Sequence, residues 1–299
     1  AGEYLVFAEM GNTDILKFFS LHDYTFINSF GKKGEGPNEL SLSPFFIPAG
    51  KKSESILTLL DWGRKVLYQV DIPDLLYTKD ITVAKSFMLP PELIFAQRVA
   101  FLQGDSILVG HGGINDGKLF KYNSLRDTTL IFTPFIPEIE NINNSEYRLG
   151  YTYAGEMAVN NGVKKVVTIS DKFKQIEIYD FNLNLLKISR LEKKPSLIYE
   201  ANKPRISYTL ETRIFYNELD FTENKIFVLY SNRSFQDLRD EKCNNNSELH
   251  IFDWNGKPLQ RYLLRGCPNQ ITYDHVNNRI IGIFLFTTTL DELIQYYQL

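Results

Sequence analysis

Six short segments of similar composition recur along the chain, and they constrain its fold more than any other feature. Most of them place an aliphatic residue first and an aromatic residue fourth. They are Ile15–Leu21, Val66–Ile72, Leu119–Leu125, Ile176–Asn182, Leu249–Asn255 and Leu293–Leu299. Consecutive segments begin 44 to 73 residues apart, and one blade of a β-propeller takes about 40–50 residues. The repeat therefore predicts six blades.

Other strand-like segments complete each blade. Before most copies a strand is expected, at Tyr4–Ala8, Ile56–Leu60, Ile107–Val109, Val163–Ile169, Lys225–Tyr230 and Arg279–Phe284. After most copies a further strand is expected, at Thr25–Phe30, Tyr77–Val83, Thr128–Thr133, Leu185–Leu191 and Leu259–Leu264. Innermost strands are expected at Phe45–Ile47, Arg98–Leu102, Gly155–Val159, Arg213–Leu219 and Gln270–Tyr273. This count leaves the first and last blades with three strands each, so either a strand is missed or a mixed blade built from both ends closes the ring.

The composition supports this architecture. The chain has 22 Phe and 17 Tyr against 3 Met, and aromatic residues suit a pleated, half-buried surface. A single blade cannot bury both of its faces, whereas blades stacked around an axis cover one another. We predict an all-β, six-bladed propeller of mostly four-stranded antiparallel blades, with residues 1–299 as one domain. A β-sandwich or several small sheets are the alternatives.

Charge and hydropathy limit the classes of partner that this chain is expected to bind. The net charge is −3 and no long basic run occurs, which argues against nucleic-acid binding. No stretch of about 20 apolar residues is present, so no transmembrane segment is predicted. The chain begins Ala-Gly-Glu without Met, which fits removal of a leader. We expect a monomer.

A glycine-rich stretch runs from Phe30 to Glu39, with Pro44 and Phe45 behind it. Three glycines in six positions mark a tight loop, because glycine reaches backbone angles that strain other residues. This stretch resembles the strand-linking motif of NHL-type propellers, and the chain is similar to TolB-like six-bladed propellers of secreted proteins and lipoproteins from gut bacteria. The other blades lack the motif, so NHL-specific partners such as RNA do not carry over. The resemblance implies a periplasmic or surface-attached protein of a bacterial cell envelope and, for most members, no established reaction.

The predicted strands place several loops on one face of the ring, where propellers usually bind ligands. These loops are Gly31–Pro44, Asp61–Lys65, His111–Gly117, Pro134–Ala154, Ser170–Lys174, Glu192–Thr212, Ser231–Ser247 and Arg265–Asn269. Long loops in compact folds are often functional, and arginine with tyrosine suits carboxylates, sugars or peptides. The binding candidates are Trp62, Arg64, His111, Asp116, Arg148, Tyr151, Tyr153, Asp171, Arg205, Tyr208 and Arg233.

A structural role competes with binding for each candidate. The long loops can be packed by their own aromatic residues, and Trp62 can belong to a packed turn in which Asp61 bonds nearby amides. Glycines around His111 favour a turn over a metal or catalytic site, and loop charges such as Asp171 are usually just solvated.

The two cysteines, Cys243 and Cys267, are predicted to lie on the same face of the fifth blade. We predict that they form a disulfide, which needs an oxidising compartment. Closing this loop would stabilise the fold by roughly 3.5 kcal/mol on the chain-entropy estimate.

The sequence contains no Gly-x-Ser-x-Gly, phosphate-binding loop or His-Glu-x-x-His motif, and we predict no cofactor, no metal and no catalytic residue. The leading function is a non-catalytic scaffold that holds a protein segment or a glycan. The alternatives are a metal-dependent lactonase- or lyase-like enzyme and a purely structural domain. The side chains that line the central channel distinguish the enzyme from the scaffold. Three or more acidic or imidazole groups close enough to share a metal ion would favour the enzyme. The inner strands offer Glu156, Asn160, Asn217, Glu218 and Asp220.

Overall fold

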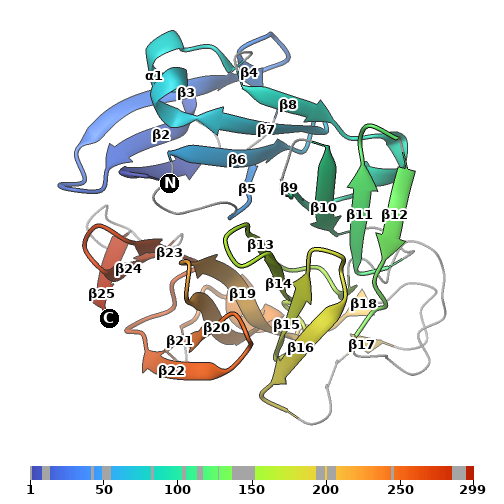
Figure 1. The fold of residues 1–299 in the computed structure, drawn as a ribbon. Coiled ribbons are helices and arrows are strands. Elements are labelled where there is room, and N and C mark those ends of the chain that lie inside the picture. Colours follow the sequence, from blue (N-terminus) through green and yellow to red (C-terminus); the bar gives the residue numbers. More distant parts are fainter. Residues whose placement is uncertain are drawn as a thin grey trace.

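The computed structural model shows a ring of six small sheets (Figure 1). It describes residues 2–8, 14–41, 44–48, 55–81, 84–102, 106–112, 117–126, 128–136, 152–192, 199–200, 207–243, 246–284 and 294–299. In Figure 1 the blades follow one another clockwise from blade 1 (dark blue) to blade 6 (red). The predicted all-β six-bladed propeller is confirmed.

Blades 1 to 3 come from the first half of the chain. Blade 1 contains β1 (Tyr4–Ala8), β2 (Asp14–Ser20), β3 (Phe26–Lys33) and β4 (Glu39–Leu40). Blade 2 contains β5 (Phe45–Phe46), β6 (Ile56–Asp61), β7 (Val66–Asp71) and β8 (Lys85–Met88). Blade 3 contains β9 (Arg98–Phe101), β10 (Ile107–His111), β11 (Leu119–Asn123) and β12 (Thr128–Phe132).

Blades 4 to 6 complete the ring. Blade 4 contains β13 (Met157–Asn160), β14 (Lys165–Ile169), β15 (Gln175–Asp180) and β16 (Leu185–Arg190). Blade 5 contains β19 (Arg213–Phe221), β20 (Ile226–Ser234), β21 (Glu248–Phe252) and β22 (Pro258–Leu263), and blade 6 contains β23 (Gln270–Asp274), β24 (Arg279–Ile283) and β25 (Ile294–Gln298). Outside the blades lie β17 (Tyr199–Glu200) paired with β18 (Ser207–Tyr208), α1 (Ile72–Thr78), α3 (Phe235–Arg239) and the 3-10 turn η2 (Pro91–Leu93).

One predicted strand is wrong. The segment Tyr77–Val83 was expected to be the outer strand of blade 2, but α1 ends at Thr78 and the outer strand is β8, Lys85–Met88. The helix starts because the Asp71 side chain accepts a hydrogen bond from the backbone N–H of Asp74 and proline occupies the first turn. Both features are strong helix-start signals, and they override the β propensity of Tyr77.

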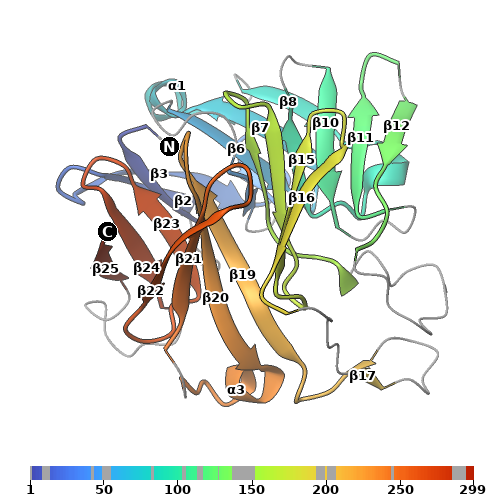
Figure 2. The ribbon, with the colours of Figure 1, turned by 60° about the horizontal axis from the view of Figure 1, so that its bottom comes forward.

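The connections between strands define a loop face. The backbone N–H of Leu89, which follows the outer strand β8, donates to the carbonyl of Lys65 in the turn between β6 and β7. In blade 3 the N–H of Gln97 donates in the same way to the carbonyl of His111. Turns between second and third strands therefore share one face with connections to the next blade, as predicted. Figure 2 shows α3 and β17 at this end of the molecule.

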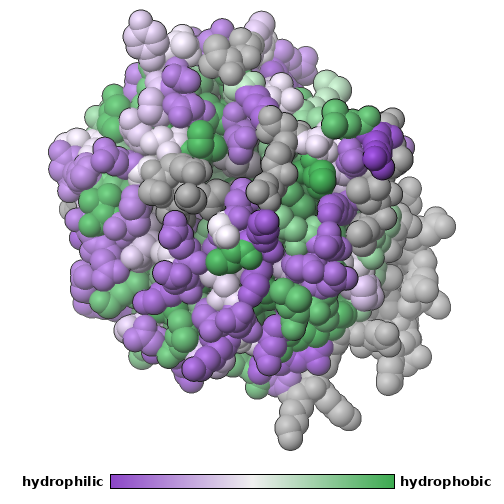
Figure 3. Space-filling model, viewed as in Figure 1, coloured by the Kyte–Doolittle hydropathy of each residue, from purple (hydrophilic) through white to green (hydrophobic). Residues whose placement is uncertain are grey.

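The blades are sealed by apolar side chains between their facing sheets. Between blades 4 and 5, Ile176 and Ile178 pack in one cluster with Tyr216, Val228 and others, all essentially buried. Each such side chain stabilises the fold by about 1.5–3 kcal/mol when buried. The opposite, far face is mostly hydrophilic in Figure 3, with hydrophobic side chains gathering near the beginning of β16, where Leu186 is 50% exposed.

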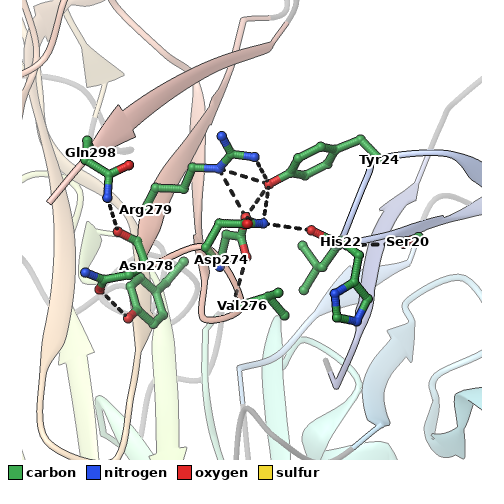
Figure 4. A network of polar contacts seen from close by, with 11 residues as sticks. Ser20, His22, Tyr24, Asp274, Val276, Asn278, Arg279 and Gln298 are labelled. Atoms are coloured by element: carbon green, nitrogen blue, oxygen red, sulfur yellow. Dashed lines mark hydrogen bonds and ion pairs between the residues drawn. The ribbon is translucent and has the colours of Figure 1, made fainter.

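Side chains join blade 1 to blade 6 (Figure 4). The Tyr24 hydroxyl donates to the Asp274 carboxylate and accepts from Arg279, whose Nε also lies 3.2 Å from the Asp274 carboxylate. Asn277 Nδ2 donates to the carbonyl of Leu21 at 2.9 Å. Among the described residues the end blades share no strand, and each keeps three antiparallel strands, with β4 added parallel to β3. No helix in the described ranges is long and apolar enough to span a membrane.

Candidate functional site

The loop face over blade 2 is organised around a buried carboxylate. Asp61 is fully buried and accepts hydrogen bonds from the backbone and hydroxyl of Ser41 and from the backbone N–H of Arg64. Arg64 in turn donates through Nη2 to the carbonyl oxygens of Gly36 and Gly34, at 2.8 and 3.2 Å. Arg64 therefore holds the glycine-rich loop in place with its guanidinium.

Trp62, in the same turn, packs against the core that includes Leu60 and Leu67. The ammonium of Lys65 lies 3.2 Å from the centre of its indole ring. A cation at this position attracts the ring face electrostatically, and it covers the surface on which a sugar would stack. Trp62 and Arg64 thus make structural contacts in this turn.

His111 ends β10 and is 1% exposed. Neither ring nitrogen has a hydrogen-bond partner among the described residues. Burial, followed by the charges of Arg98 and Lys118, holds the pKa of His111 well below its usual value. The imidazole is therefore neutral. Gly112 beside it has φ +111, and a Cβ at this position would collide with Gln97, so the turn requires glycine here.

Over blades 4 and 5 the loop face carries a group of aromatic and charged side chains, which we call the rim cluster: Tyr153, Asp171, Lys172, Tyr208 and Phe235. The Lys172 ammonium lies 2.5 Å from the Asp171 carboxylate. It also lies 5.1 Å from the ring centre of Tyr208 and 5.6 Å from that of Phe235. The structure thus brings together three of the predicted residues, Tyr153, Asp171 and Tyr208, from three different connections.

Only part of the rim cluster faces solvent. Tyr153 is 2% exposed and lies between the rings of Phe135 and Phe173, at 4.9 and 5.1 Å between ring centres. Tyr208 and Phe235 are half-buried, with the Tyr208 hydroxyl donating to Thr152. Burial raises the pKa of Asp171, although Lys172 opposes this shift. One oxygen of Asp171 is buried and the other pairs with Lys172, so the surface available to a ligand is that of Tyr208 and Phe235.

Arg233 was expected in a loop, but β20 continues to Ser234 and Arg233 lies within this strand. It is 6% exposed, because Ser234 caps α3 immediately afterwards and the strand extends to meet the helix. Four other candidates, Asp116, Arg148, Tyr151 and Arg205, lie outside the described residues.

A central cavity of about 520 Å³ follows the ring axis. Its walls are mostly apolar inner strands, together with Arg98, Glu156, Glu218 and Asp220. Arg98, at the start of β9, binds the Glu156 carboxylate through Nε at 2.5 Å and through Nη2. Such two-point pairs are strong and directional. Arg98 also lies over the ring of Phe45, 4.4 Å from its centre.

The remaining two carboxyl groups of the cavity differ in environment. Asp220 accepts hydrogen bonds from the Thr272 hydroxyl and the Tyr273 N–H, at 2.9 and 2.8 Å, and so connects blades 5 and 6. Burial raises the pKa of Glu218 well above its usual value, and repulsion from Glu156 adds to this. A carboxyl group kept neutral can donate a hydrogen bond as well as accept one. The cavity therefore places a carboxyl group of raised pKa beside an ion pair.

Sequence reasoning named Glu156, Glu218 and Asp220 as inner-strand acids but missed Arg98. The first residue of an inner strand faces the loop-face end of the channel, and Arg98 holds that position in β9. In the described part of the chain, no three His, Cys, Asp or Glu residues are grouped so as to hold a metal ion. The lining is mixed rather than a ring of metal ligands.

A second cavity, of about 660 Å³, lies between the outer strands of blades 4 and 5, away from the channel. His250 lines it, with Nδ1 2.9 Å from the Tyr216 hydroxyl and Nε2 2.7 Å from the Glu248 carboxylate. Burial lowers the pKa of His250. Both ring nitrogens are thus engaged by neighbours.

The structure contains the predicted disulfide between Cys243 and Cys267, with a Cα–Cα distance of 5.7 Å. Cys243 follows α3 and Cys267 follows β22, so the bond ties two loop-face connections of blade 5 together. The sequence separation is 24 residues.

Comparison with known proteins supports the fold. Residues 140–275 match the family described as TolB-like 6-blade propeller-like, which agrees with the predicted resemblance. A member of the DUF4221 family from Bacteroides vulgatus superposes with a TM-score of 0.60 at 10% identity, covering 99% of this chain and 90% of that one. A "putative exported protein" from Bacteroides fragilis superposes with a TM-score of 0.51 at 14% identity and the same coverage. No curated protein gave a significant sequence match.

Proposed function

We propose that this protein is a non-catalytic binding scaffold of a bacterial cell envelope, which holds a protein segment or a glycan on its loop face. The observation that carries the proposal is the joint presence of the rim cluster and a mixed, partly charged channel. Tyr208 and Phe235 offer half-buried aromatic surface beside the ion pair of Lys172 and Asp171. Carboxylates accept hydrogen bonds from hydroxyl and amide groups, and aromatic faces stack on sugars and side chains. The ring acts as one domain and as a monomer.

Two observations support the envelope location. The Cys243–Cys267 bond is of a kind that persists in oxidising compartments and is rare in the cytosol. One of the similar structures is described as a "putative exported protein" from Bacteroides fragilis. A periplasmic or surface-attached position fits both.

A metal-dependent lactonase- or lyase-like enzyme is the second candidate. Glu218 favours it, because a carboxyl group with a strongly raised pKa in a cavity is typical of acid–base sites. This function would need further ligands beside Glu156 and Glu218, and purified protein would then hold about one equivalent of a divalent metal and open lactone rings.

The experiment compares Tyr208→Ala with Tyr77→Ala on a glycan array and a displayed peptide library. Tyr77, on α1, is 91% exposed and lies on the far face, so it is a matched control. Wild type and Tyr77→Ala are expected to bind the same set of ligands. Tyr208→Ala is expected to bind them at least about fivefold more weakly, since truncating an aromatic anchor costs about 1 kcal/mol or more. Absence of binding by wild type, or equal binding by Tyr208→Ala, contradicts the proposal.

A further inference from the structure

Blade 1 differs from the others at its innermost position. The inner strands β5, β9, β13, β19 and β23 each follow a loop-face connection and run away from the loop face. The end of β1 pairs with the start of β2, which pairs with the end of β3 next to the glycine-rich loop. Strand β1 therefore runs toward the loop face, as the second strands of the other blades do. Within the described ranges, no strand lies between β1 and the axis.

The inner edge of β1 carries backbone groups that have no backbone partner among the described residues. The Glu3 carbonyl accepts from the N–H of Leu21, and hydrogen-bonded pairs alternate along an antiparallel ladder. Leu5 and Phe7 therefore bond to β2, while the N–H and C=O groups of Val6 and Ala8 point to the opposite edge. Among the described residues neither Val6 nor Ala8 has a backbone partner there.

The central cavity lies along this edge. All five residues of β1 line it, as do residues of β5, β6 and β23. The side chains of β1 alternate between two apolar clusters. Val6 and Ala8 pack toward the cluster shared with blade 2, and Leu5 and Phe7 toward that shared with blade 6. A strand added beside β1 would therefore meet apolar surface on both of its faces.

We propose that β1 is a strand-acceptor site, at which an extended segment of a partner protein pairs antiparallel with β1 inside the channel. The segment has alternating apolar side chains and lies with its amino end toward the loop face, as the inner strands of the other blades do. An exposed strand edge is a ready template for another chain, and backbone bonds supply the affinity. This inference rests on the proposed function and names its partner as a protein segment.

The probes are five synthetic hexapeptides that copy the inner-strand regions of blades 2 to 6. At least one is expected to bind and to slow hydrogen exchange at the Val6 and Ala8 amides at least tenfold, measured by NMR. The Leu5 and Phe7 amides, already bonded to β2, are expected to change little. Lack of binding by all five, or slow exchange at Val6 and Ala8 in the protein alone, overturns the proposal; the latter would mean that its own chain fills the site.

A protein variant and a pair of modified peptides sharpen the test. Val6→Pro removes an N–H that does not bond to β2, so it should abolish peptide binding while leaving the melting temperature nearly unchanged. Should that variant unfold, the peptide copying residues 155–160 gives the second test. Methylation of its Ala158 nitrogen, which faces the neighbouring strand in blade 4, should abolish binding, whereas methylation of its Val159 nitrogen should not.

The two proposals fail in different ways. If the strand site is wrong, Val6→Pro binds partners as well as wild type does, while Tyr208→Ala still weakens ligand binding. If the scaffold function is wrong, wild type binds nothing on the glycan array or in the peptide library.

Discussion

Replacing Lys118 by methionine should destabilise the contact between blades 3 and 4. Lys118 precedes β11, and its Nζ lies 2.6 Å from the carboxylate of Glu177 in β15. The two side chains are 1% and 0% exposed. Glu177 also accepts from Gln175 Nε2 and the Tyr179 hydroxyl, each at 2.5 Å. Removing the ammonium would leave a buried carboxylate with dipolar partners only.

The size of the effect follows from the burial of both charges. Removing one partner of a buried ion pair costs about 3–5 kcal/mol. With an unfolding entropy of about 2.1 cal/mol/K per residue, a chain of 299 residues loses about 1.6 °C of melting temperature per kcal/mol. Lys118→Met should therefore lower the melting temperature by about 5–8 °C at pH 7.

Calorimetry of Lys118→Met, Glu177→Gln and the double variant checks this reasoning. The double variant should be more stable than Lys118→Met alone, because the uncompensated charge is gone while Tyr179 keeps a hydrogen-bond acceptor. A change below about 2 °C, or a double variant with the summed loss of both singles, would refute the argument.

Three further changes test other parts of the ring. Tyr24→Phe deletes hydrogen bonds to charged groups such as Asp274, each worth about 1.5–3 kcal/mol, so calorimetry should show a loss of about 2–5 °C; an unchanged melting temperature contradicts this. Replacing Cys243 and Cys267 by serine should cost roughly 3.5 kcal/mol, and denaturant titration that shows less than about 1 kcal/mol would rule it out. Burial raises the pKa of Glu218, so the free energy of unfolding falls as pH rises above the ordinary pKa of a carboxyl group, by up to about 1.4 kcal/mol per pH unit. Glu218→Gln should remove this fall between pH 4 and 8. Parallel pH profiles of the free energy of unfolding for wild type and variant would count against this reasoning.

The strands of the blades were predictable because their pattern is local. All six repeat segments form strands within three residues of the predicted bounds, from β2 to β25. Aromatic and β-branched residues in short alternating runs decide this locally. The segment at Tyr77 was mispredicted, because the capping residue Asp71, six residues earlier, and Pro73, four residues earlier, favour a helix.

The site was less predictable than the fold because its residues converge from distant parts of the chain. Arg98 and Glu156 are 58 residues apart and form an ion pair. Nothing in either local sequence indicates this, since it depends on two inner strands meeting at one axis. Conversely, Trp62, Arg64 and His111 looked accessible in their loops, and the structure engages or buries them in packed turns. Burial of this kind depends on neighbouring blades.

The junction between blades 1 and 6 has a mechanical consequence. Every other pair of neighbouring blades is linked by continuous polypeptide, whereas this pair is held by Tyr24, Asn277, Arg279 and the apolar contacts around Leu21. Across the part of the chain that the structure describes, force applied between blades 1 and 6 is therefore borne by non-covalent contacts. The propeller can open at this junction without breaking a covalent bond. A covalent link between blades 1 and 6 would therefore increase its resistance to unfolding more than a link elsewhere.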